Sequence, residues 1–315
     1  MSKEIFSKRL IFVVGKGGVG KTTLSVSLAL AAARSGKKTL IVEVGDADSV
    51  GEVFNIGTLP QTPRKLYSNI WGARIFSKQV LEDYINTHVK LSFVANQITR
   101  SKLFEHIAAA TPGLKEVMTL GQIWRWEQEK GVSNYPKYDL IIVDAPATGH
   151  GTSLLKLPKT LIDMLKGGPI VEQTKIVHEM LTDKNKTWLT LVTLPEELPV
   201  NESIEFRNTA KNDINMPVKI TFINGVYSEL FSEKNFNVID NLLNNKKFMN
   251  KDKLNDYILK VAKNHYIRRN IQKKYICKIK EKAEELIIEI PFYFINDIKV
   301  KDSEQIAQLL INKLK

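Results

Sequence analysis

Six short runs of Val, Ile and Leu recur along the chain, each bounded by a turn signal or by the start of a helical pattern. They cover residues 10–14, 39–44, 140–143, 189–193, 218–223 and 286–290. Short runs that are mainly apolar and rich in Val and Ile indicate strands buried on both faces of a parallel sheet. The pattern therefore predicts a central parallel sheet covered by helices on both faces.

Helical spacing fills much of the sequence between these runs. Residues 21–34 and 198–211 each place apolar side chains on one helix face. Strands that alternate with helices predict an α/β fold with a doubly wound, mostly parallel sheet, which binds ligands at the carboxyl ends of its strands. The last helical pattern, residues 303–315, favours a final crossover packed on the sheet over a membrane-surface helix.

Two stretches are too long to be simple crossovers. Residues from about 65 to 130 and from about 227 to 282 are almost wholly helical in pattern. We therefore expect one domain over residues 1–315, with helical insertions at about 65–130 and 227–282.

The composition is that of a folded chain with one basic region. The 315 residues are 43% hydrophobic and carry a formal net charge of +12, so disorder of the whole chain is excluded. Residues 246–282 contain 13 Lys and Arg but only three Asp and Glu, and hold most of this charge. The favoured interpretation is a solvated Lys-rich helix face; docking to an acidic protein, an anionic membrane or nucleic acid is the alternative.

One motif carries the chemistry. The run GKGGVGKT follows the first apolar run, precedes the helical pattern that begins at Lys21, and satisfies the phosphate-loop pattern GxxxxGK[ST]. Its glycines let backbone N–H groups point at phosphates, Lys21 is expected to reach the β- and γ-phosphates, and Thr22 to ligate Mg²⁺. The residues expected to bind ATP in this region are Gly15, Lys16, Gly17, Gly18, Val19, Gly20, Lys21, Thr22 and Thr23.

Lys16, directly after the first glycine, is an additional feature. With it the loop resembles the deviant KGGxGKT phosphate loop of a P-loop NTPase class (SIMIBI) that includes septum-site and partition ATPases, nitrogenase iron proteins, and arsenical-pump and tail-anchored-protein targeting ATPases. The resemblance implies that Lys16 crosses a dimer interface to the nucleotide of the other subunit. A charge placed there stabilises the negative charge that develops on the transferred phosphoryl group.

A later segment resembles one branch of that class. The predicted strand at residues 140–143 leads into Asp144, a carboxylate suited to a Mg²⁺ site, and the chain continues as Ala-Pro-Ala-Thr-Gly-His. This run is similar to the second switch of the arsenical-pump (anion-transporting) and tail-anchored-targeting ATPases, and further similarities span most of the chain. The resemblance implies that Asn224 recognises adenine and that Pro291 and Phe292 begin the loop that covers it.

The first switch departs from that family. Its members carry an Asp after the second strand that orients the attacking water, whereas an alignment without gaps places Gly45 there. A one-residue shift of the loop would bring in Asp46, which is the candidate for this catalytic role. The alternative is a weakly hydrolysing regulatory subunit that works beside a paralogue.

A single cysteine, Cys277, limits the metal chemistry of the chain. It excludes an internal disulfide and a CxxC zinc pair, so we expect no zinc, and it cannot supply the several thiolates of a metalloid site. The apolar run at the start of the chain is too short for a signal peptide, so a cytoplasmic location is expected.

The resemblance implies a partner as well as a nucleotide. We expect a Mg²⁺-dependent, ATP-hydrolysing homodimer, or heterodimer with a paralogue, that acts on an unidentified client protein. Contact with a membrane surface stays open, and nucleic acid is disfavoured. The alternative function is a partition-type ATPase that binds DNA through residues 246–282.

Overall fold

A computed structural model describes residues 2–45, 48–76, 79–80, 113–131, 134–165, 167–244, 253–295 and 297–314. Its centre is a sheet of eight described strands in the order β3-β4-β2-β5-β1-β6-β7-β8. The strands are β1 (Leu10–Gly15), β2 (Thr39–Val44), β3 (Arg64–Tyr67), β4 (Ile70–Ile75), β5 (Leu140–Asp144), β6 (Thr187–Thr193), β7 (Val218–Val226) and β8 (Leu286–Pro291). All neighbouring strands are parallel except β3 and β4. The doubly wound α/β fold and all six expected strands are confirmed.

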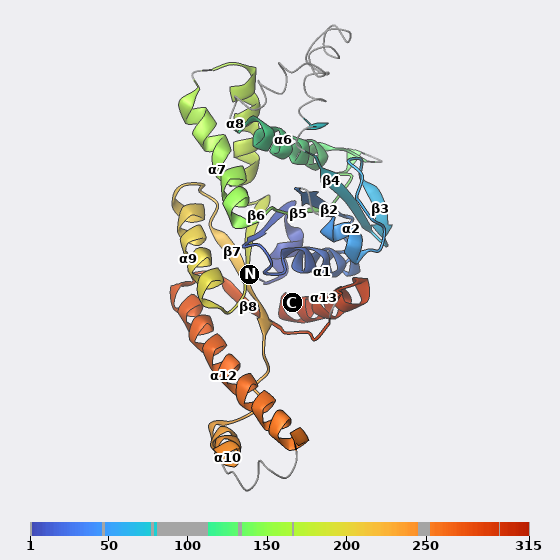
Figure 1. Cartoon of the computed structure of the whole chain (residues 1–315). Coiled ribbons are helices and arrows are strands. Elements are labelled where there is room, and N and C mark those ends of the chain that lie inside the picture. Colours follow the sequence, from blue (N-terminus) through green and yellow to red (C-terminus); the bar gives the residue numbers. More distant parts are fainter. Residues whose placement is uncertain are drawn as a thin grey trace, which may run out of the picture.

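Helices cover both faces of the sheet (Figure 1). They are α1 (Lys21–Arg34), α2 (Ser49–Val53), α6 (Leu114–Gln128), α7 (Thr148–Met164), α8 (Pro169–Thr182), α9 (Glu197–Asn212), α10 (Glu233–Asn244), α12 (Lys253–Lys282) and α13 (Val300–Leu314), with a 3₁₀ turn at Ser2–Ser7. Within the described part of the chain, no helix has the length and hydropathy needed to cross a bilayer.

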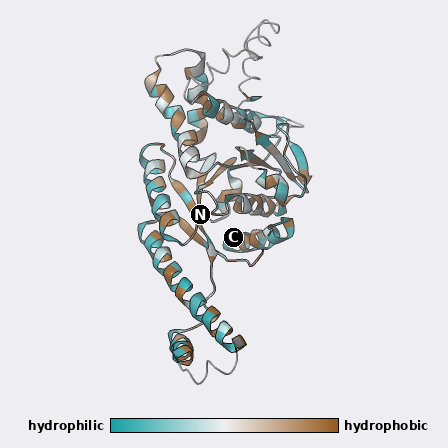
Figure 2. Ribbon diagram, in the orientation of Figure 1, coloured by the Kyte–Doolittle hydropathy of each residue, from teal (hydrophilic) through white to brown (hydrophobic). Residues whose placement is uncertain are grey.

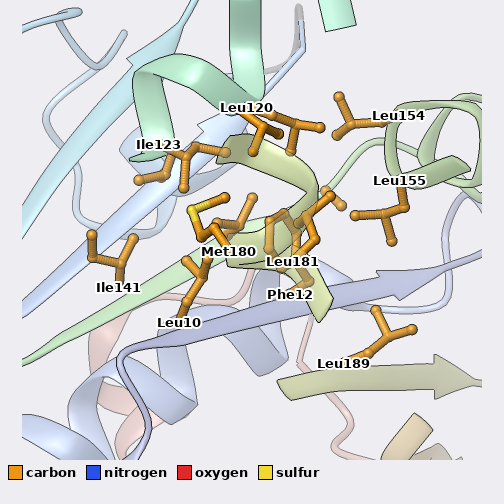
Figure 3. Packing of buried hydrophobic residues seen from close by; sticks show 14 of the residues in the cluster. Leu10, Phe12, Leu120, Ile123, Ile141, Leu154, Leu155, Met180, Leu181 and Leu189 are labelled. Atoms are coloured by element: carbon orange, nitrogen blue, oxygen red, sulfur yellow. The ribbon is translucent and has the colours of Figure 1, made fainter. Parts of the chain in front are cut away.

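The alternating side chains of the strands build two cores. Leu10 and Phe12 of β1 enter a cluster with α6, α7 and α8, whereas Ile11 and Val13 enter a cluster with α1 and α13. Figure 3 shows the first cluster, in which Phe12 lies beneath apolar side chains of these helices. Because both faces are covered, the central strands are mostly apolar, as the sequence pattern predicted.

The final helix packs as the last crossover. Ile306, Ala307, Leu310 and Leu314 of α13 are buried in the cluster that also contains α1. The face that would have contacted a membrane surface is therefore occupied by the body of the protein, and the expectation of crossover packing is confirmed.

The first insertion is shorter than expected. Residues 64–75 form the antiparallel hairpin β3–β4 at the edge of the sheet, so the helical prediction from about residue 65 was wrong there. The turn residue Asn69 has a φ of 56°, a left-handed conformation that Asn tolerates and that does not occur inside a right-handed helix. Helix α6 confirms the helical prediction for residues 114–128, and residues 81–112 lie outside the described residues.

The second insertion is helical, as predicted, in the described residues 233–244 and 253–282. Helices α10 and α12 form an arm that extends away from the sheet (Figure 1), and α12 is mainly hydrophilic with apolar positions interspersed (Figure 2). Several of its basic side chains pair with acidic ones, for example Lys263 with Asp240 and Arg269 with Glu229. Part of the positive charge is thus neutralised within the arm.

Candidate nucleotide site

The phosphate loop connects β1 to α1 at the carboxyl edge of the sheet, where its glycines are required by close packing. A Cβ on Gly15 would collide with the carbonyl oxygen of Val192 in β6. Gly20 has a φ of +92°, and a Cβ there would collide with the Asn224 side chain. The loop can therefore follow this path only with glycine at both positions.

Lys21 lies over the loop that it follows. Its Nζ donates a hydrogen bond to the carbonyl oxygen of Lys16 at 2.9 Å. Burial lowers the pKa of Lys21, and the nearby Asp144 carboxylate partly opposes this shift. The Lys21 ammonium group and the N-terminus of α1 thus both place positive charge at the phosphate loop. This charge favours the binding of phosphates there.

Asp144 ends β5 beside the start of α1. Its carboxylate accepts hydrogen bonds from Thr22 Oγ1 at 2.6 Å and from Ser25 Oγ at 3.1 Å. Burial raises its pKa, while the Thr22 hydrogen bond and the Lys21 charge oppose the shift. A buried carboxylate beside a hydroxyl forms a set of hard oxygen donors, so Thr22 and Asp144 fit a Mg²⁺ ion.

Ser25 and Glu43 belong to this site but were missed by the sequence reasoning. Glu43 is paired in register with Asp144 across the β2–β5 boundary, and its Oε1 accepts a hydrogen bond from the backbone N–H of Val50 at 3.1 Å. Burial raises the pKa of Glu43 to about 7, against the opposing effect of the Val50 hydrogen bond. The only sequence signal was one charged residue inside an apolar run.

Arg74 holds the described part of the first switch in place. It is only 4% exposed, its Nε donates to the carbonyl oxygen of Gly45 at 2.8 Å, and its guanidinium pairs with Asp48. Gly45 has a φ of +120°, a backbone conformation that favours glycine. Asp46, the residue expected to orient water, lies outside the described residues, so its role stays a prediction.

Lys16 pairs within its own chain. Its Nζ lies 2.6 Å from Glu202 Oε1 in α9, and both side chains are about one-third exposed. The expectation that Lys16 crosses to a second subunit stays a prediction. The partly exposed ion pair leaves the lysine accessible.

The residues expected to bind adenine are absent from the lining of the main cleft. Asn224 Nδ2 donates to the carbonyl oxygen of Val19 at 3.0 Å. Phe292 packs on Tyr227 with ring centroids 5.0 Å apart, and Pro291 ends β8. Asn224 thus lies next to the phosphate loop, Pro291 and Phe292 lie beside the end of β7, and the contact of all three residues with adenine stays a prediction.

An open cleft of about 520 Å³ lies at this edge of the sheet. Of the residues expected from the sequence, its lining contains the following: Gly18, Gly20, Lys21, Thr22, Thr23 and Asp144. The sequence did not indicate the other side of the cleft, formed by Glu43, Glu52 and residues 297–299. That side comes from loops far apart in the chain.

Comparison with known proteins agrees with this geometry. The sequence profile of a family described as anion-transporting ATPase matches residues 8–169, which is just over half of the chain and contains the phosphate loop, Glu43 and Asp144. The chain belongs to the anion-transporting ATPase family. The suspected resemblance is thereby confirmed.

Several curated relatives are similar to this chain. The ATPase BagA of Mycobacterium tuberculosis is 33% identical over 202 residues, which cover 62% of this chain and 59% of that relative. A putative arsenical pump-driving ATPase 2 of Aquifex aeolicus is 29% identical over 251 residues, covering 70% of this chain and 81% of the relative. The ATPase ASNA1 homolog 1 of Paramecium tetraurelia is 38% identical over 153 residues, covering 48% and 44%. The chain thus spans less than two thirds of the first relative's length.

Proposed function

We propose that this protein binds Mg²⁺ and ATP in the cleft at the carboxyl edge of the sheet and hydrolyses the ATP. The observation that carries the proposal is the juxtaposition of Lys21, Thr22 and Asp144, which the fold brings together from a loop and a distant strand. The family name and the names of the relatives support the same activity.

Each of these residues has a separate task in phosphoryl transfer. The loop N–H groups and Lys21 bind the β- and γ-phosphates and neutralise their charge. Thr22 and Asp144 hold the Mg²⁺ ion, which supplies charge stabilisation at the phosphate oxygens. Hydrolysis also needs a group that orients the attacking water. We place this group in the first switch, next to Gly45.

The proposed active form is a dimer. Two chains close around two nucleotides, and Lys16 leaves Glu202 to reach the nucleotide of the other subunit. The lysine is accessible, since its ion pair is about one-third exposed and such pairs are worth only about 0–1 kcal/mol. Closure on ATP and reopening after hydrolysis would then act on a client protein.

A second candidate is a weakly hydrolysing subunit that pairs with a paralogue. The specific observation in its favour is Gly45, which replaces the expected switch carboxylate. Turnover by the purified chain alone distinguishes this candidate from the homodimer, because a regulatory subunit would need its partner for hydrolysis.

The test combines turnover with the size of the protein in solution. We expect wild-type chain to hydrolyse ATP only with Mg²⁺, and Lys21→Ala to be inactive. With ATP, Asp144→Asn should accumulate as a dimer, which light scattering detects by its mass. A client protein should co-purify with this dimer. Salt-sensitive DNA binding that requires ATP would instead support the partition-type alternative. A wild-type chain that binds no nucleotide would overturn the proposal.

A further inference from the structure

Glu43 occupies an unusual place for a charged residue. It follows Ile41 on β2 just as Asp144 follows Ile142 on β5, and both isoleucines pack in the cluster beneath α1. Side chains two residues apart point to the same face of a sheet. Glu43 and Asp144 are therefore directed side by side towards α1 and the phosphate loop.

The Glu43 carboxylate is buried but only half satisfied. The residue is 3% exposed, and Oε1 accepts the hydrogen bond from Val50 N–H. The other oxygen, Oε2, is buried without a hydrogen-bond partner among the described residues. Buried carboxylate oxygens are normally paired, so this oxygen indicates a missing partner.

The nearest basic side chain is already engaged. Arg74 faces Glu43 across the β2–β4 pair, but its hydrogen bonds go to Gly45 and Asp48. Among the described contacts, the Glu43 carboxylate accepts hydrogen bonds from backbone N–H groups, those of Ser49 and Val50. The residue also lines the nucleotide cleft, which gives Oε2 access to something bound there.

We propose that Glu43 is a positioning residue that holds a water ligand of Mg²⁺ beside Asp144. In this role Oε2 accepts a hydrogen bond from the water, and the carboxylate adds negative charge near the ion. Glu43 thereby supplies, from within β2, a carboxylate on the side of the site where Gly45 has none. This inference rests on the proposed use of Mg²⁺ and ATP.

The role predicts a specific effect on the metal. Groups that hold metal ligands through a hydrogen bond typically change metal affinity or activity by about 10–100-fold when they are removed. Nucleotide affinity without metal should not depend on Glu43, because the phosphates are bound by Lys21 and the loop. A residue with only a structural role would instead change both affinities together with the thermal stability.

The experiment titrates Mg²⁺ into full-length protein that holds a non-hydrolysable ATP analogue, and measures the half-saturating Mg²⁺ concentration. Glu43→Gln is expected to raise this concentration about 10-fold or more. Its melting temperature should not fall, and its metal-free nucleotide affinity should stay within about two-fold of wild type. Glu43→Asp, which keeps the charge on a shorter side chain, is expected to recover part of the Mg²⁺ affinity.

Glu179→Gln is the matched control, because Glu179 is an exposed carboxylate on α8 that does not line the nucleotide cleft. It should leave the Mg²⁺ titration unchanged. A shift below about two-fold in Glu43→Gln, against the 10-fold or more expected, would overturn the inference. The inference would also be overturned if both Glu43 variants lost metal-free nucleotide affinity and melting temperature to the same extent. The proposed function itself would fail if adding Mg²⁺ did not change nucleotide binding by the wild-type protein, or if Lys21→Ala bound nucleotide as well as wild type. These outcomes distinguish a failure of the proposed function from a failure of the inference about Glu43.

Discussion

The nucleotide edge of the sheet and the outer half of α12 depart from ordinary burial in opposite ways. At the edge, polar side chains such as Glu43 and Asp144 are buried. On the outer half of α12, the apolar residues Leu254, Ile258 and Val261 are about half to two-thirds exposed. Buried polar groups and exposed apolar groups are the informative exceptions in a fold, since most side chains follow the rule.

The two regions teach different lessons about what holds this fold. At the edge, Glu43 and Asp144 are positioned by their register in neighbouring strands and have a chemical task in the proposed site. In α12, Ile276 and Ile279 of the inner half pack against α9 and β7, whereas the apolar residues of the outer half are exposed. Apolar residues of one helix are therefore expected to stabilise the fold in its inner half and to contribute little in its outer half.

The largest expected effect separates chemistry from folding at the nucleotide edge. Lys21→Ala removes the charge that stabilises the phosphates, so ATP turnover should fall by about 10³-fold or more, roughly 4 kcal/mol of transition-state stabilisation. Steady-state phosphate release measures this loss. Lys260→Ala on the arm, which removes an exposed pair with Asp256, is the matched control and should keep wild-type turnover.

The next effect is on stability rather than activity. Ile279 is fully buried in the contact between α12, α9 and β7, so Ile279→Ala should lower the free energy of unfolding by about 3 kcal/mol through lost burial and a residual cavity. Urea denaturation followed by circular dichroism measures the change. A loss below about 1 kcal/mol would mean that the inner half of α12 is not part of the cooperative fold.

How far the sequence alone reaches depends on whether a feature is local. The phosphate loop and the six apolar strands were predictable because their signals lie within a few consecutive residues. The β3–β4 hairpin was missed because its edge strand is mostly exposed and lacks an apolar run. The tasks of Glu43 and Arg74 depend on neighbouring strands, which become visible only when the sheet order is known.

Lys16 shows the same limit within the candidate site. The motif identifies Lys16, but the partner of this lysine, Glu202, lies 186 residues away and is brought near by α9. A spacing of this length carries no sequence signal. The location of a motif was therefore predictable, whereas the contacts that hold its side chains were not.

A smaller effect is expected for that ion pair. Glu202→Ala removes a contact whose two side chains are about one-third exposed, so the free energy of unfolding should change by less than about 1 kcal/mol. Because Lys16 is then free to reach a second subunit, ATP-dependent dimerisation should become tighter, by up to about five-fold. Analytical ultracentrifugation with Asp144→Asn as background measures this. Weaker dimerisation would show that Glu202 helps to form the interface instead of competing with it.

The smallest effect tests the outer half of α12. Ile258 is 52% exposed, so Ile258→Ala should change the free energy of unfolding by less than about 0.5 kcal/mol and leave ATP turnover unchanged. Ile279→Ala on the same helix is the matched comparison in the same denaturation experiment. A loss at Ile258 comparable to that at Ile279 would mean that both halves of the helix are buried in solution, and the contrast between the nucleotide edge and the arm would then disappear. If the two losses differ as expected, an isoleucine of α12 stabilises the fold only where other elements cover it, because burial determines what each isoleucine contributes.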